Sequence, residues 1–137
     1  MISLFGDDLL PRRRTMGSAG YDFAMPVRTV VPSHGSVTID SGIRMEDGDI
    51  PEGFVMLIMP RSSLGMRHGL RQLNTVGVID SDYRGSIRFA LTADDDLLIE
   101  RGERFAQGVI VPYAVIPSEV PPTEERTGGI GSTGRMA

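Results

Sequence analysis

Residues 74–85, with the sequence NTVGVIDSDYRG, combine side chains that can bind a ligand and assist a hydrolysis. Asn74 offers both a hydrogen-bond donor and an acceptor, which the edge of a pyrimidine base requires. Asp80 and Asp82 are two residues apart, so in an extended segment their carboxylates share one face, and one of them can activate water as a general base. Tyr83 adds an aromatic ring suited to packing on a sugar. The letters DYRG also favour a tight turn, so this segment alone leaves both interpretations open.

Residues 60–70, with the sequence PRSSLGMRHGL, form a second candidate region. Arg61, Ser62 and Ser63 together supply several donors that can bind an anion. The alternative is purely structural: either serine is a good helix N-cap, and Arg61 is then one partner of a surface ion pair. The segment by itself does not separate these two interpretations.

Two further stretches are polar or glycine-rich. In residues 101–110 (RGERFAQGVI), Gln107 interrupts an apolar run, and it either serves a site or hydrogen-bonds two strands together. In residues 126–135 (RTGGIGSTGR), the backbone N–H groups can surround a phosphate, but the spacing is not that of a Walker loop. Disorder is the alternative for this last stretch.

The elements that position these segments are predicted to be short strands. Seventeen glycines and nine prolines interrupt the chain, and no convincing amphipathic helix is present apart from a short one expected at 63–67. The runs between these residues are rich in Val, Ile, Phe and Leu and predict strands at 27–31, 36–44, 53–60, 87–92, 96–100 and 106–115. Many short strands with turns between them indicate a sandwich, barrel or jelly roll.

Length and composition indicate one small domain. The chain has 137 residues, and we expect a β domain at 1–116 followed by a mobile Pro/Gly-rich arm at 117–137. It has no cysteine, no apolar run long enough for a membrane helix and no secretory signal, so we expect a cytoplasmic protein, or one in the host cytoplasm if phage-encoded. The net charge of −4 argues against direct nucleic-acid binding. The acidic run at 94–96 is expected to be an exposed turn rather than a metal site.

Taken in order, five stretches resemble the motifs of the trimeric dUTP pyrophosphatase (dUTPase) family. They are SAGYDF at 18–23, PRSSLGMRHGL at 60–70, NTVGVIDSDYRG at 74–85, RGERFAQ at 101–107 and GGIGSTG at 128–134. The resemblance covers essentially the whole chain. It implies a homotrimer of distorted jelly-roll or β-barrel subunits that hydrolyses dUTP to dUMP and pyrophosphate, with Mg²⁺ held mainly by substrate phosphates and water. Such an activity limits uracil incorporation into DNA and supplies dUMP for thymidylate synthesis.

The resemblance also implies roles for individual residues. Asp80 would deprotonate the water that attacks the α-phosphorus, and Asp22 would position the Mg²⁺-triphosphate or orient Arg61. Residues expected at the uracil and deoxyribose are Asn74, Gly77, Val78, Ile79, Tyr83 and Ile130. Residues expected at the phosphates are Arg61, Ser62, Ser63, Gln107, Arg126, Gly131, Ser132 and Thr133. Each active site would take its motifs from three chains, the arm coming from the third.

Three departures from the family pattern are visible. Ile130 stands where the family usually has an aromatic ring, which removes a stacking contribution of ~1 kcal/mol. The arm is one residue shorter between Arg126 and the paired glycines, and Ser63 stands where the family often has glycine. The related dCTP deaminases share an RSSL stretch, but they need a glutamate on the strand that here reads SIRFAL at 86–91. A non-catalytic protein that senses dUTP is the other alternative, and the presence of Asp80 argues against it.

Overall fold

The computed structural model describes residues 1–124, 126 and 128, which are organised mainly as short strands. The strands are β1 (Ile2–Ser3), β2 (Tyr21–Ala24), β3 (Thr29–Val31), β4 (Val37–Asp40), β5 (Ile43–Arg44), β6 (Phe54–Pro60), β7 (Arg71–Gln72), β8 (Gly77–Ile79), β9 (Arg88–Thr92), β10 (Leu97–Ile99) and β11 (Arg104–Pro112). The helical elements are a 3₁₀ turn, η1 (Asp7–Leu9), and one α-helix, α1 (Ser62–His68). The all-β prediction is confirmed.

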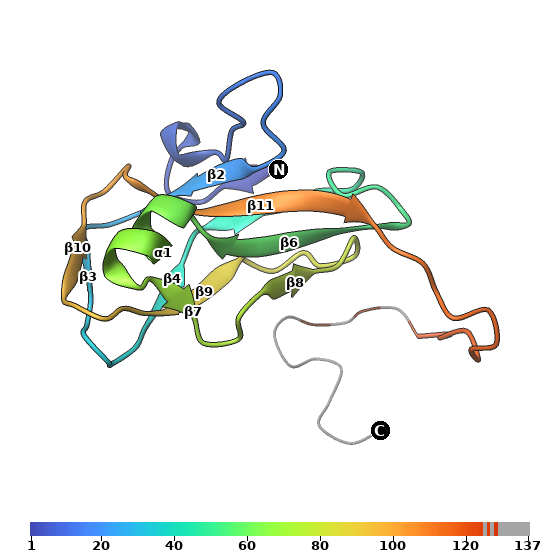
Figure 1. The fold of residues 1–137 in the computed structure, drawn as a ribbon. Coiled ribbons are helices and arrows are strands. Elements are labelled where there is room, and N and C mark those ends of the chain that lie inside the picture. Colours follow the sequence, from blue (N-terminus) through green and yellow to red (C-terminus); the bar gives the residue numbers. More distant parts are fainter. Residues whose placement is uncertain (125, 127, 129–137) are drawn as a thin grey trace.

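Two antiparallel sheets carry the segments of interest. The larger has the strand order β2-β11-β6-β8, and the smaller has the order β4-β9-β7; β1 pairs with β5 and β10 with β3. Figure 1 shows β6 and β11 side by side across the molecule, with α1 directly after the end of β6. The subunit is a distorted jelly roll in which β6 and β11 form the long central pair.

The core joins these two sheets through three phenylalanines. Phe23 on β2, Phe89 on β9 and Phe105 on β11 are fully buried. The Phe89 ring lies 5.3 Å from the Phe23 ring and 4.9 Å from the Phe105 ring, both edge to face, which is a favourable aromatic geometry. Ile87, directly before β9, is fully buried as well.

Replacing Phe89 by alanine is expected to lower the free energy of unfolding by ~3–5 kcal/mol, because it removes the central ring and leaves a cavity. Urea unfolding followed by circular dichroism measures this loss. Val30→Ala is the control, since Val30 is 52% exposed and its truncation should change stability by less than about 0.5 kcal/mol. Equal losses in both variants would show that the three rings do not form the centre of the core.

The predicted strands differ from the observed ones where a strand pairs over only a few residues or where a glycine interrupts the extended backbone. The run predicted at 36–44 is divided into β4 and β5, because Gly42 has a φ of 69° that ends an extended strand. Strands β1, β2, β7 and β8 were not predicted, since each has only two to four residues and is defined by its neighbours. The helix expected at 63–67 is confirmed as α1.

The chain beyond β11 has no regular structure where it is described. Residues 112–124 are all exposed, and they leave the sheet at the end opposite α1 (Figure 1). The division into a domain at 1–116 and an arm from 117 stays a prediction, because residues 125, 127 and 129–137 lie outside the described part of the chain. Among the described residues, no helix is long and apolar enough to cross a membrane.

Candidate active site

Asp22, on β2, is the centre of a cluster of arginines. Its side chain is 12% exposed and accepts a hydrogen bond of 2.8 Å from Arg104 Nη1. Arg61 Nε lies 3.3 Å from the other carboxylate oxygen, and Arg14 Nε lies 3.8 Å away. One carboxylate cannot neutralise three guanidinium groups, so this region carries an excess of positive charge suited to phosphate. The three arginines and Asp22 line a cavity of about 380 Å³ together with Ser18, Ser62 and Gln107.

Strand pairing brings these distant segments together. Gln107 on β11 lies opposite Asp22 on one side and opposite Met59 on the other. The Arg61 N–H donates to the carbonyl of Phe105, which holds the start of α1 against β11. A side chain at Gly20 would lie only 2.6 Å from Gln107 Oε1, so glycine permits this close approach. The first, second and fourth sequence motifs therefore form one group within a single chain.

The two serines of α1 face different cavities. Arg61 is the N-cap residue, and no side-chain hydrogen bond caps this helix, so the serine-cap interpretation is wrong. Ser62 lines the cavity beside Asp22, whereas Ser63 lines a neighbouring cavity of about 640 Å³ with Arg67. Arg61 contributes to both cavities. Its ion pair with Asp22 fits the expectation that Asp22 orients Arg61.

The segment after β8 is a tight turn that also brings its two carboxylates together. The Tyr83 N–H donates to the carbonyl of Asp80 at 3.1 Å, which closes the turn. Arg126 donates from Nε to Asp82 at 2.9 Å and from Nη2 to Asp80 at 2.5 Å. One guanidinium thus reaches both carboxylates, although they lie in a turn and not in the extended segment that the sequence prediction assumed. The hydrogen bond to Asp82 is the main cause that raises the pKa of Arg126 above its usual value.

Tyr83 was expected to be an aromatic ring that packs on a sugar, but its side chain is mostly buried. The side chain is 8% exposed, and its hydroxyl donates to the carbonyl of Ser86 at 3.0 Å. Gly85 allows the ring to lie close, because a side chain at this position would come within 2.5 Å of the Tyr83 hydroxyl. The Arg126 guanidinium lies 5.8 Å from the centre of the ring. The ring position is therefore fixed by packing before any ligand binds.

Strand β8 lies at an edge of the larger sheet, where β6 is the only described strand that pairs with it. Gly77 and Ile79 face the core, whereas Val78 is 61% exposed. A side chain at Gly77 would overlap the side chain of Ile58 on the adjacent strand. The unpaired backbone of an edge strand can hydrogen-bond an extended partner or the edge of a base. Asn74 is exposed in the loop before β8.

The arginine cluster and the acidic turn lie at opposite ends of β6. Ile79 pairs with Met56, which places Asp80 near Val55 in the register of the sheet. Arg61 is six residues further along, so at 3.3 Å per residue the two positions are roughly 20 Å apart along the strand. One chain therefore presents the candidate base and the candidate phosphate-binding group at separate places on its surface.

The candidate residues of the glycine-rich arm cannot be placed. Ile130, Gly131, Ser132 and Thr133 lie outside the described residues, and only Arg126 of this group has a described position. The described part of the chain contains no group of three His, Cys, Asp or Glu side chains arranged to hold a metal ion.

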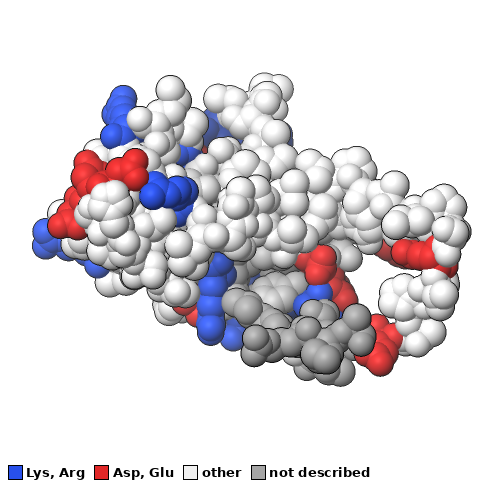
Figure 2. Space-filling view, turned by 60° about the horizontal axis from the view of Figure 1, so that its bottom comes forward, with Lys and Arg blue, Asp and Glu red and all other residues white. Residues whose placement is uncertain are grey.

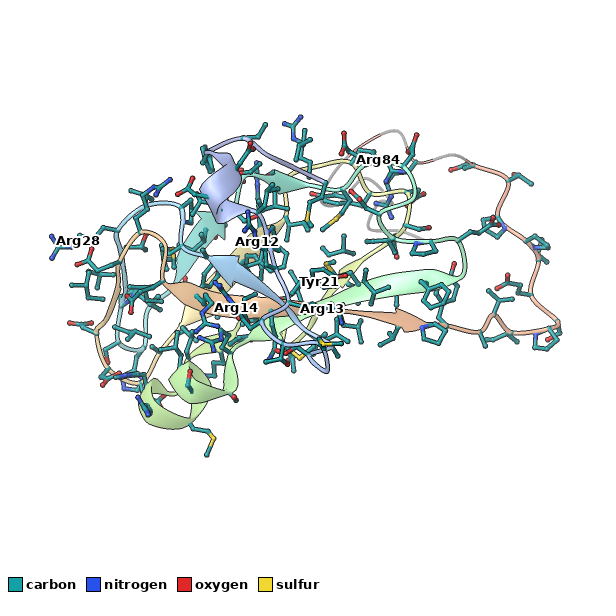
Figure 3. The ribbon with its side chains drawn as sticks, turned by 90° about the horizontal axis from the view of Figure 1, so that it is seen from above. Arg12, Arg13, Arg14, Tyr21, Arg28 and Arg84 are labelled. Carbon is teal, nitrogen blue, oxygen red and sulfur yellow. The ribbon has the colours of Figure 1, made fainter. Side chains whose placement is uncertain are left out.

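The sequence pattern did not identify Arg14 or Gln72 as candidates. Arg14 belongs to a run of three arginines, and Figure 3 shows Arg12 and Arg14 over the sheet near β2, whereas Arg28 and Arg84 lie toward opposite ends of the molecule. Arg13 instead ties its own loop together by donating to the carbonyls at positions 16 and 18. Figure 2 shows basic and acidic side chains gathered toward the left end and along the lower edge of the face it presents, whereas the upper middle of that face is uncharged. The run of three arginines was the sequence feature that could have identified Arg14 as a site residue, whereas no sequence feature singled out Gln72.

Comparison with known proteins places this geometry in a family. A family model described as dUTPase matches residues 8–134. The chain is 40% identical over 135 residues to the deoxyuridine 5'-triphosphate nucleotidohydrolase of Hydrogenobaculum sp. (strain Y04AAS1), covering 93% of this chain and 92% of that protein. It is 42% identical over 135 residues to the protein of the same name from Brucella melitensis biotype 2, covering 91% of this chain and 84% of that protein.

Solved structures agree with the sequence comparisons. The dUTPase of Streptococcus mutans superposes with a TM-score of 0.69 at 33% identity and covers 82% of this chain and 92% of its own. The Staphylococcus bacteriophage 80alpha dUTPase with dUpNHpp superposes with a TM-score of 0.70 at 25% identity and covers 97% and 96%. The match of the family model over nearly the whole chain, together with these relatives, shows that the chain belongs to the dUTPase family.

Proposed function

We propose that this protein hydrolyses dUTP to dUMP and pyrophosphate by attack of water on the α-phosphorus. The observation that carries the proposal is membership of the dUTPase family over residues 8–134. The arginine cluster around Asp22 supports it, because phosphoryl transfer depends mainly on positioning and on neutralising phosphate charge. The names of the two relatives, deoxyuridine 5'-triphosphate nucleotidohydrolase, give dUTP as their substrate, which also supports the proposal.

The phosphates bind, in this proposal, to the residues that line the cavity beside Asp22. Arg61 supplies a charged fork of donors, and Ser62 and Gln107 supply neutral ones. Ser63 extends the group toward the neighbouring cavity. Asp22 orients Arg61 through their ion pair, which reduces the entropy lost when the guanidinium binds phosphate.

Asp80 acts as the general base. Its carboxylate is half exposed at the turn after β8 and can accept a proton from a water molecule that attacks the α-phosphorus in line. The new bond joins the water oxygen to the α-phosphorus, and the bond to the oxygen bridging the α- and β-phosphorus breaks. Pyrophosphate leaves with that oxygen, and the proton stays on Asp80. Asp82 shares Arg126 with Asp80 and serves to organise the turn.

Uracil and deoxyribose bind along the edge of β8. Asn74 and the backbone of Gly77, Val78 and Ile79 read the base, because an edge strand presents donors and acceptors in fixed positions. The rigidly packed Tyr83 ring limits the space beside the sugar and excludes a 2′-hydroxyl. Ile130 covers the base from the arm.

Mg²⁺ binds mainly to substrate phosphates and water. The described acidic residues form no three-ligand group, and the carboxylate of Asp22 is already held by arginines, so the donor set suits an ion that arrives with the nucleotide. When bound, the ion neutralises phosphate charge and polarises the α-phosphoryl group. Arg61, Ser62 and Gln107 then orient the phosphate chain relative to Asp80.

The complete site is shared between subunits of a homotrimer. The support for this is the separation of roughly 20 Å along β6 between Asp80 and Arg61. The α-phosphate of one nucleotide cannot lie beside Asp80 while its phosphate chain contacts Arg61 of the same chain. A neighbouring copy brings its arginine cluster to the Asp80 turn. When substrate binds, Arg126 gives up its ion pairs with Asp80 and Asp82, and together with Gly131, Ser132 and Thr133 of the arm it closes over the terminal phosphates.

A substrate panel tests the proposed function. Purified protein with Mg²⁺ is incubated with dUTP, dCTP, dTTP, dATP, dGTP or UTP, and pyrophosphate and nucleoside monophosphate are measured. We expect kcat/KM for dUTP to exceed that for every other nucleotide by at least about 100-fold. Ammonia release from dCTP would instead indicate a deaminase. Tight dUTP binding without turnover would indicate a sensor.

A further inference from the structure

Gln72, at the end of β7, is a buried amide in direct contact with Asn74. The side chain is 5% exposed, and its Nε2 donates to Asn74 Oδ1 at 3.1 Å. Its Oε1 is also buried and accepts no hydrogen bond from any residue the structure describes. Buried polar atoms are normally satisfied, so retaining an amide here instead of an apolar side chain calls for a reason other than stability.

The backbone around this pair is held in place. Gln72 pairs with Leu91 on β9, and the carbonyl of Gln72 accepts a hydrogen bond from Thr75. Thr75 has a φ of 64°, which is uncommon for a residue other than glycine and turns the chain sharply into β8. The Cα of Asn74 is therefore fixed, and the remaining freedom is the rotation of its side-chain amide.

We infer that Gln72 fixes Asn74 as a hydrogen-bond donor toward the base and is thereby a positioning residue for uracil selection. In the orientation that the structure gives, Gln72 turns its Nε2 toward Asn74, and because this group donates and cannot accept, Asn74 turns its oxygen inward and its Nδ2 group outward. Uracil carries an acceptor oxygen at its 4-position, whereas cytosine carries an amino donor there. Without Gln72, Asn74 can rotate and offer its oxygen to cytosine. This inference rests on the proposed function, in which Asn74 reads the base.

Replacement of Gln72 by methionine removes the donor while nearly preserving side-chain volume. The readout is the ratio of the dissociation constants of dCMP and dUMP, measured by calorimetry or as competitive inhibitors. We expect this ratio to fall about fivefold, the factor that corresponds to one neutral hydrogen bond. The ratio does not depend on the fraction of folded protein. Saturated turnover of dUTP should change less than about twofold, because the chemistry at phosphorus is distant from the base.

Two further variants separate positioning from general loss of structure. Leu73→Ala is the matched control, since Leu73 is the next residue and is 60% exposed; its ratio should stay at the wild-type value. In an Asn74→Ala background, Gln72→Met should no longer change the ratio, because Gln72 acts only through Asn74. An unchanged ratio in the single variant Gln72→Met, or an equal change with and without Asn74, would overturn the inference.

Failure of this inference and failure of the proposed function give different results. If wild-type protein hydrolyses dUTP and prefers dUMP over dCMP, but Gln72→Met keeps that preference, only the role of Gln72 is wrong. If wild-type protein neither hydrolyses dUTP nor distinguishes dUMP from dCMP, the proposed function is wrong and the inference falls with it.

Discussion

Replacing Asp80 by asparagine is expected to reduce kcat for dUTP by about 10²–10⁴-fold, the contribution of a positioned general base. The amide cannot accept the proton of the attacking water, although it has nearly the same shape as the carboxylate. Binding of dUTP should change little, because the phosphate-binding residues Arg61, Ser62 and Gln107 are unchanged in this variant. Single-turnover kinetics separate the chemical step from binding, and calorimetry measures the dissociation constant.

Asp82→Asn is the matched control for this experiment. Asp82 lies in the same turn, is similarly exposed and shares the guanidinium of Arg126 with Asp80. Its replacement perturbs the same ion pair without removing the proposed base, so we expect a loss of turnover within about tenfold. If Asp80→Asn retains turnover, or if Asp82→Asn is the more damaging change, Asp80 is not the base.

Mixing two inactive variants is expected to restore activity if the active site is shared between subunits. Asp80→Asn lacks the base but keeps Arg61, whereas Arg61→Ala keeps the base. In a homotrimer assembled at random from equal amounts, one site in about four combines an intact Asp80 from one chain with an intact Arg61 from its neighbour. The mixture should therefore show about a quarter of wild-type turnover, whereas either variant alone stays below about 1%.

The control is a mixture of Asp80→Asn with Asp80→Ala, which has no intact Asp80 and should stay inactive. Differently tagged chains, co-purified after joint refolding, verify that mixed assemblies have formed. Mixed assemblies without restored turnover would show that Asp80 and Arg61 act from the same chain, contrary to the separation along β6.

Local sequence was a good guide to the segments and a poor guide to their strand boundaries. Strands β6, β9 and β11 were predicted because their apolar runs are long enough to be distinctive. Strands β2 and β8 were missed, because they are short, carry candidate site residues and become strands through hydrogen bonds to β11 and β6. Such pairing depends on residues far away in the chain, which a local pattern does not contain.

The turn at Asp80 shows how far local information reaches. The letters DYRG predicted a turn at 82–85, whereas the hydrogen-bonded turn lies two residues earlier, from Asp80 to Tyr83. The spacing of Asp80 and Asp82 predicted a shared face in an extended segment; one guanidinium reaches both carboxylates, but from a turn. The burial of Tyr83 was not predictable, because it depends on packing into the core and on the close approach of Gly85. The roles of these residues in substrate binding and catalysis stay predictions for the experiments above.

The sequence alone determined the all-β class, the family and the short segments that carry the candidate chemistry, because these properties reside in local patterns and ordered motifs. Only the tertiary structure decided which candidates meet. Asp22 and Arg61 are far apart in the chain, yet Arg61 Nε lies 3.3 Å from the Asp22 carboxylate. Strand register likewise placed Asp80 and Arg61 at opposite ends of β6, because antiparallel pairing converts sequence distance into position along the sheet.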